Sequence, residues 1–160
     1  MRLRPLTPST LRVLVALPLL ALAACQPAGP EVVPPEADDP ELYRGAVLRV
    51  TEVMTHDIFS PPQASRVYAY VTVAAYEALA PTRPGMVSLA GQLRDLEAPP
   101  VPADDVHGPT AAVYAALAVG EALTFSAGDI DSYREEAAAA LREAGLSRRL
   151  LDQSAAYGEA

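Results

Sequence analysis

The sequence predicts an all-α protein, a partial bundle of about five helices. Three observations predict this class. From residue 40 onward, apolar residues recur at the three- and four-residue spacing of helices. Most of the apolar segments follow a proline or a short polar side chain of the kind that begins helices. The alternation of polar and apolar residues that marks a strand does not compete anywhere along the chain.

Residues 1–24 are predicted to be a signal peptide and no part of this fold. Three arginines make the beginning basic, and an apolar run from 13 to 24 follows them. The alternative is a membrane-spanning anchor. The run contains Pro18 and is shorter than the roughly 20 residues that cross a bilayer, which favours the signal peptide.

Cys25 is the only cysteine, and it ends the segment Leu22-Ala23-Ala24-Cys25. This segment resembles the bacterial lipobox, in which the cysteine is acylated and becomes the first residue of the mature protein. The resemblance implies a lipoprotein of the bacterial cell envelope, held to the membrane by the acyl chains on Cys25. Gln26 follows the cysteine, which favours the outer membrane if the host is Gram-negative.

The charge of the chain excludes several kinds of partner. The net charge is −8, and it becomes −11 without the three arginines of the signal peptide. The chain contains no lysine. Such a chain lacks the basic surface that nucleic acids require, and it would not be held electrostatically to anionic lipid. With its cysteine acylated, the mature chain of 136 residues has no disulfide, and its length suits one domain.

Residues 25–39 are predicted to be an extended tether, because prolines alternate there with small and acidic residues. The helical region, 40–160, begins with an Asp N-cap at Asp39 and a proline in the first turn. Its first helix is expected to end near His56.

The second and third helices are apolar almost all round. The second follows Ser60, occupies 63–80 and stops at Pro81, and the third occupies 110–125. Helices of this kind are usually buried on all sides. The connection between them, 81–108, is long and rich in proline and acid.

Cap residues indicate where the last two helices begin. Ser126-Ala127-Gly128-Asp129 resembles a capping box that would start the fourth helix, which is expected to end at Gly145. Ser147 is expected to cap a fifth helix that continues to Ala160.

This arrangement predicts a deficit in packing. The helices 63–80 and 110–125 require cover on every side, whereas each of the other three can bury only one stripe. We therefore expect the bundle to be incomplete, with a missing C-terminal half or a protein partner covering these two helices. The alternative is that alanine-rich surfaces tolerate water.

Two clusters could suggest a chemical site. Adjacent residues His56 and Asp57 point about 100° apart on a helix, so a solvated helix end is the favoured interpretation. The run Asp104-Asp105-Val106-His107 matches no known spacing of metal ligands, which favours an acidic loop.

Two carboxylates, Glu77 and Glu121, lie within apolar helices, where an unpaired charge is costly. They could be paired functional acids with a raised pKa. The commoner alternative is a bond to backbone amides or to an arginine such as Arg66 or Arg83. Three tyrosines of the second helix are expected in the core or an interface: Tyr68, Tyr70 and Tyr76.

Three segments carry a resemblance to a known family: Phe59 to Tyr70 with its continuation Ala74 to Leu79, Ser88 to Leu93, and Ser154 to Gly158. Together they resemble the N-terminal helical region of bacterial vanadium-dependent haloperoxidase-related proteins, which share a fold with type 2 phosphatidic acid phosphatases. The resemblance covers roughly residues 45–160.

The resemblance implies an all-helical protein that holds vanadate or phosphate within a bundle. Relatives use the motifs Lys-x6-Arg-Pro, Pro-Ser-Gly-His and Ser-Arg-x5-His-x3-Asp, and this sequence contains none of them. No catalytic, cofactor-binding or metal-binding residue is therefore expected here. Vanadate or phosphate is expected only in full-length relatives.

The leading hypothesis is a non-catalytic N-terminal fragment of an exported, lipid-anchored haloperoxidase- or phosphatase-like protein. Alone, the chain is predicted to be inactive. The alternative is a stand-alone helical envelope lipoprotein that binds a partner protein. A small-molecule binding module, supported only by the loop 81–108, ranks last.

Overall fold

The computed structural model describes residues 32–160, and Val33–Ala160 form one compact unit. The predicted signal peptide, Cys25 and most of the predicted tether lie outside the described residues.

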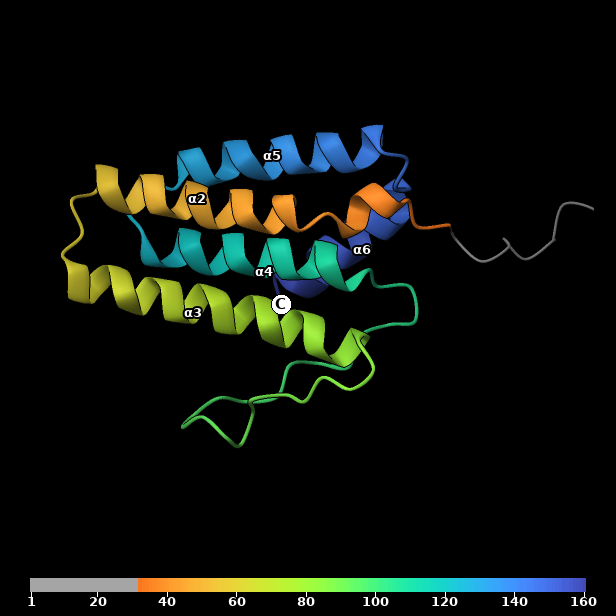
Figure 1. Ribbon diagram of the computed structural model, residues 1–160, viewed down its shortest axis with the longest axis horizontal. Coiled ribbons are helices and arrows are strands. Elements are labelled where there is room, and N and C mark those ends of the chain that lie inside the picture. The colour runs from red at the N-terminus through yellow and green to blue at the C-terminus, as the bar shows by residue number, and fades with distance from the viewer. Residues whose placement is uncertain (1–31) are drawn as a thin grey trace, which may run out of the picture. The chain divides into compact units, whose positions relative to one another are not determined.

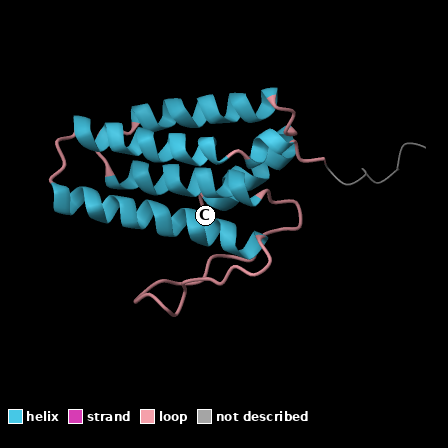
Figure 2. Cartoon of the chain, in the orientation of Figure 1, coloured by secondary structure: helices cyan, strands magenta, loops and turns pink. Residues whose placement is uncertain are grey.

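Helices make up the described fold (Figures 1 and 2). The α helices are α2 (Pro40–His56), α3 (Pro61–Leu79), α4 (Gly108–Leu123), α5 (Gly128–Glu143) and α6 (Arg148–Gly158). Two short 3-10 helices accompany them, η2 (Pro35–Asp38) and η3 (Ala80–Thr82). The prediction of an all-α partial bundle of about five helices is confirmed.

Local capping explains where three of these helices begin. The Asp39 side chain accepts a 2.9 Å hydrogen bond from the backbone N–H of Glu41. The backbone N–H of Ser60 donates to the Gln63 side chain at 3.1 Å. Ser147 accepts from the N–H of Leu150 at 3.2 Å. Each bond satisfies a backbone donor that a helix start leaves unpaired.

The structure corrects the expected start of α5. Its N-cap is Ala127, which forms no side-chain cap, and the Ser126 hydroxyl donates instead to Asp57 at 2.6 Å. The capping box predicted at Ser126 is wrong because a carboxylate from the end of α2 takes this hydroxyl.

The structure also corrects the end of the tether. Pro35–Asp38 form η2, and Ala37 within it is 1% exposed, packed against Tyr114 and Leu141. These residues, predicted to be extended, therefore belong to the folded body. The last helix differs too, because α6 ends at Gly158 with Glu159 as its C-cap.

The centre of the bundle is α4. It packs against α2, α3, α5 and α6, and its residues from Ala111 to Leu117 are all buried. Cover was expected to be missing here, and that expectation is wrong for this part of the helix. α6 supplies the missing side, because Gly158 allows it to approach the backbone of Ala111 closely.

By contrast, α3 is buried along a stripe that includes Val67, Val71 and Ala75, and at Glu77, where the segment after η3 covers it. Tyr70 on its outer side is 58% exposed. The expectation that this helix is buried on all sides is therefore wrong for the described residues.

The segment from residue 83 to 107 runs along the outside of the bundle beside α3 (Figure 1). Within residues 32–160, no helix combines the length and the apolar character needed to cross a membrane.

Candidate functional site

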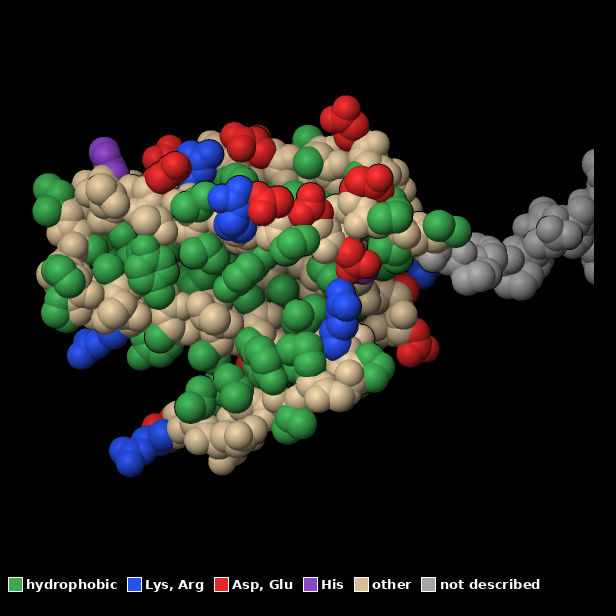
Figure 3. Space-filling model, viewed as in Figure 1, with side chains coloured by type: hydrophobic (Ala, Val, Ile, Leu, Met, Phe, Trp, Pro, Cys, Tyr) green, Lys and Arg blue, Asp and Glu red, His purple; other side chains and the backbone are tan. Residues whose placement is uncertain are grey.

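A groove lies between α2 and α3, and α4 forms its floor. α4 packs against both of these helices, which contact each other much less. The groove, called the α2–α3 groove below, has a volume of about 350 Å³. Hydrophobic side chains gather over this region of the surface (Figure 3). Its lining is Ala37, Asp38, Asp39, Pro40, Leu42, Tyr43, Thr72, Ala75, Tyr76, Leu79, Arg83, Pro109, Ala112 and Val113.

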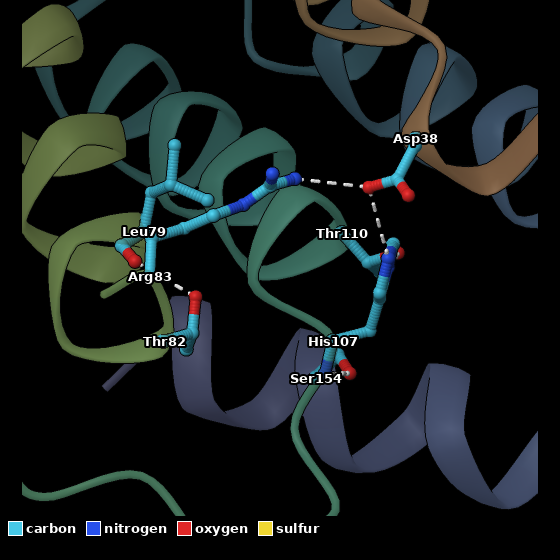
Figure 4. Close-up of polar contacts among 7 residues, drawn as sticks. All are labelled: Asp38, Leu79, Thr82, Arg83, His107, Thr110 and Ser154. Carbon is cyan, nitrogen blue, oxygen red and sulfur yellow. Dashed lines mark hydrogen bonds and ion pairs between the residues drawn. The ribbon is translucent and has the colours of Figure 1, made fainter. Parts of the chain in front are cut away.

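At one end of this groove, Asp38 connects two cationic or basic side chains (Figure 4). Its Oδ1 atom lies 3.0 Å from Nη2 of Arg83 and 3.5 Å from Nε2 of His107. Asp38 is the last residue of η2, Arg83 directly follows η3, and His107 directly precedes α4. The contacts therefore hold three distant parts of the chain together.

His107 is 9% exposed, and each of its polar groups has a partner. Its backbone N–H donates to Oγ of Ser154 at 2.8 Å, and its Nδ1 lies 2.9 Å from the hydroxyl of Thr110. Burial lowers the pKa of the imidazole, an effect that the nearby Asp38 carboxylate opposes. The ring is therefore held neutral over a wider pH range than usual.

Asp38, His107 and Thr110 contact one another in the sequence carboxylate, base and hydroxyl that is found in nucleophilic triads. Thr110, however, is 1% exposed and lies in the first turn of α4. A substrate has no access to this hydroxyl, so the arrangement stabilises the start of the helix and does not form an active site.

Glu77 holds the segment after η3 against α3. This carboxylate is 5% exposed and accepts two 2.6 Å hydrogen bonds, from the Ser88 hydroxyl and the Leu89 backbone N–H. The interpretation as a bond to backbone amides is confirmed, with Ser88 added. Arg83, considered as its partner, pairs with Asp38 instead.

Glu121 pairs with an arginine that sequence reasoning did not name. Its carboxylate lies 2.8 Å from Nη2 of Arg134, which also contacts Asp131 and Glu159. Neither Arg66 nor Arg83 takes this role, and Glu77 and Glu121 do not form a pair of acids.

Asp57 is not the solvated helix end that its position suggested. It accepts from the backbone N–H groups of Phe125 at 2.7 Å and Ser126 at 3.2 Å, as well as from the Ser126 hydroxyl. The hydroxyl bond is the largest cause of its lowered pKa. His56 is exposed and takes no part in these bonds.

The acidic run before α4 is divided between two structural roles. Asp105 pairs with Arg149 of α6, whereas His107 faces Asp38 and Thr110. Within residues 32–160, no three His, Cys, Asp or Glu side chains converge where they could hold a metal ion.

The tyrosines of α3 differ in their surroundings. Tyr68 shares a 2.8 Å hydrogen bond with Thr51 of α2, and Tyr76 donates to the carbonyl of Val87 at 2.8 Å. Tyr70 lines a second groove, of about 820 Å³, between α3, α4, the segment from Leu96 to Pro100 and the end of the chain. We call this the α3–α4 groove.

Comparison with solved structures finds a crystal structure described as that of the first bacterial vanadium-dependent iodoperoxidase. It superposes with a TM-score of 0.69, at 39% sequence identity over 81% of this chain. The fold of this chain is haloperoxidase-related. The haloperoxidase-related region spans 30% of the length of the iodoperoxidase chain. No protein-family model matches the sequence, and no curated protein matches it.

The segments that carried the haloperoxidase resemblance hold packing residues. Ser88 binds Glu77, Ser154 binds His107, and Gly158 lies against Ala111. Sequence reasoning missed the network around His107. One signal was present, a histidine directly before the Gly-Pro that begins α4, but its partners lie far away in the sequence.

Proposed function

We propose that this chain is a non-catalytic helical part of an exported, lipid-anchored protein of the haloperoxidase or phosphatase type. The observation that carries the proposal is the 39% identity to the iodoperoxidase, over a region that makes up 30% of that protein. In a complete protein of this type, vanadate or phosphate would be held by residues beyond the matched region.

The placement of the arginines supports a non-catalytic role. Binding of a highly charged oxyanion requires several cationic donors that converge on one point. Six arginines of the described chain each pair with an acidic side chain: Arg44, Arg49, Arg83, Arg134, Arg148 and Arg149. Their charge is already offset locally, and they do not form one cluster.

The α3–α4 groove supports the idea that further polypeptide packs on this body. Apolar residues of both helices line it, together with residues 96–100 and 157–160. The occupant would be a C-terminal half of the same protein. The second candidate function, a stand-alone envelope lipoprotein that binds a partner protein through these helices, rests on the same groove.

The DNA downstream of the coding sequence distinguishes these two functions. An in-frame continuation that encodes Pro-Ser-Gly-His supports the first function. A stop codon without any downstream remnant of the three oxyanion motifs supports the second.

An activity assay tests the non-catalytic role. The purified chain is incubated with orthovanadate, hydrogen peroxide and iodide or bromide, and separately with a phosphomonoester. We expect no rate above that of the protein-free control. A vanadate-dependent rate, or hydrolysis of the ester, would refute the proposal.

The lipid anchor at Cys25 requires its own test, because it is independent of the helical body. Cells that express the chain are labelled with palmitate, and the Cys25→Ser variant serves as control. We expect label and membrane association only in the unchanged chain. Label on both proteins, or processing of the unchanged chain that is insensitive to globomycin, would contradict the anchor.

A further inference from the structure

We infer that the α2–α3 groove is a binding site for a small uncharged molecule, an apolar skeleton of about two fused rings that carries one hydrogen-bond acceptor. This site is separate from the α3–α4 groove and from any oxyanion chemistry. The inference does not depend on the proposed function.

The shape of the groove suits such a molecule. Its walls come from η2, α2, α3 and α4, and its volume of about 350 Å³ lies within the range of natural small-molecule sites. Leu42, Leu79 and Val113 contribute branched apolar side chains, and Ala75 and Ala112 leave room between the helices. A ligand without charge would gain from the burial of its apolar surface here.

The charges on the rim argue against an ionic ligand. Arg83 and Asp38 neutralise each other at 3.0 Å, and the Asp39 carboxylate accepts the N–H of Glu41 at the start of α2. An anion would meet two carboxylates beside one guanidinium, and a cation would compete with Arg83 for Asp38. Either ion would also lose hydration in an apolar groove, and the guanidinium of Arg83 is already paired with Asp38.

A hydrogen-bond acceptor is expected on the ligand because the groove is lined by hydroxyl groups that are available to donate. The hydroxyls of Tyr43 and Thr72, which both line the groove, make no hydrogen bond to another described residue. The hydroxyl of Tyr76, which also lines the groove, already donates to the carbonyl of Val87. A ketone, ether or alcohol oxygen could accept from Tyr43, which is half-buried.

The experiment compares four probes of one shape: 2-naphthylmethanol, 2-methylnaphthalene, 2-naphthoate and 2-naphthylmethylammonium. Binding to the purified full chain carrying Cys25→Ser, which removes acyl chains as competing ligands, is followed by NMR shifts. We expect the alcohol to bind saturably and both ions to bind about tenfold more weakly, a difference of about 1.4 kcal/mol. Tighter binding of either ion, or absence of saturable binding by the alcohol, would overturn the inference.

Two variants locate the probe. Thr72→Phe fills the groove from an exposed position and should weaken binding of the alcohol about tenfold. Thr55→Phe, a matched change at an exposed position outside the groove lining, should leave binding unchanged. Equal affinities in these two variants would contradict the site.

Tyr43→Phe keeps the shape of the groove and removes one hydroxyl. The variant should bind the alcohol about three- to tenfold more weakly, as expected for one lost hydrogen bond. Its affinity for 2-methylnaphthalene should not change. If binding of both probes weakens equally, or binding of neither does, the inferred hydrogen bond from Tyr43 to the ligand is wrong.

Discussion

The backbone N–H of His107 donates a 2.8 Å hydrogen bond to Oγ of Ser154, 47 residues later in the chain. Both residues are buried, with Ser154 completely inaccessible. The bond joins the start of α4 to the middle of α6, so it fixes where the long segment after η3 ends. The integrity of the bundle around α4 should therefore depend on this serine.

Ser154→Ala should lower the free energy of unfolding by about 1–3 kcal/mol, because the buried N–H of His107 loses its acceptor. Urea denaturation followed by circular dichroism measures the change. Ser132→Ala is the matched control, since Ser132 is exposed and donates only to a carbonyl of its own helix. The control should change stability by less than about 0.5 kcal/mol. Equal effects of the two substitutions would contradict the role of Ser154.

His107 should make stability fall in mild acid. Burial lowers its pKa in the folded state, with Asp38 opposing and Arg83 adding to the effect. The unfolded chain therefore binds the proton more readily. The contribution of His107 is complete above about pH 6.5, the unfolded pKa, and decreases as the pH falls toward the folded pKa.

The measurement compares His107→Gln with the unchanged protein at pH 7.5 and pH 5.5. The unchanged protein should lose more of its unfolding free energy between these two pH values than the variant does. An equal loss in both proteins would show that another group causes the acid sensitivity.

Gly158→Ala should displace α6 from α4. A Cβ atom at this position would lie 2.2 Å from the carbonyl oxygen of Ala111, and a backbone atom cannot move aside cheaply. We expect a loss of about 1–3 kcal/mol from overpacking, despite the better helix propensity of alanine. Gly128→Ala is the control, because nothing lies within 4 Å of its added Cβ. A Gly158→Ala protein as stable as this control would contradict the close approach of the helices.

Asp57→Asn should loosen the connection between α4 and α5. The carboxylate accepts three hydrogen bonds there, and its bond with the Ser126 hydroxyl is the largest cause of its lowered pKa. An acid with a lowered folded pKa stabilises the fold above its unfolded value, and this contribution is lost as the pH falls through the folded pKa. The difference in urea midpoint between the two proteins should be full near pH 7 and shrink below about pH 3.8. A difference independent of pH would exclude the charge as its cause.

Helix positions could be predicted from the sequence because their determinants are local. Asp39-Pro40 and Ser60-Pro61 begin helices through bonds within three residues of the cap. Burial could not be predicted in the same way, since it depends on which other elements lie nearby. Thus α4 is covered by α6, whereas Tyr70 of α3, a helix also expected to be buried, remains exposed.

The candidate site was less accessible to sequence reasoning. Asp38, Arg83 and His107 come from three segments, and no spacing along the chain indicates that they meet. The capping box at Ser126, expected to start α5, was predicted wrongly for a related reason. Its partner, Asp57, lies 69 residues away and competes with the local bond.

The most direct test of the proposed non-catalytic role is a titration of orthovanadate with the purified chain, followed by ⁵¹V NMR. If this body only supports an oxyanion site formed elsewhere, the vanadate signal should show no saturable loss as protein is added. Saturable binding at one vanadate per chain would mean that these helices hold the oxyanion themselves, and the proposed function would be wrong.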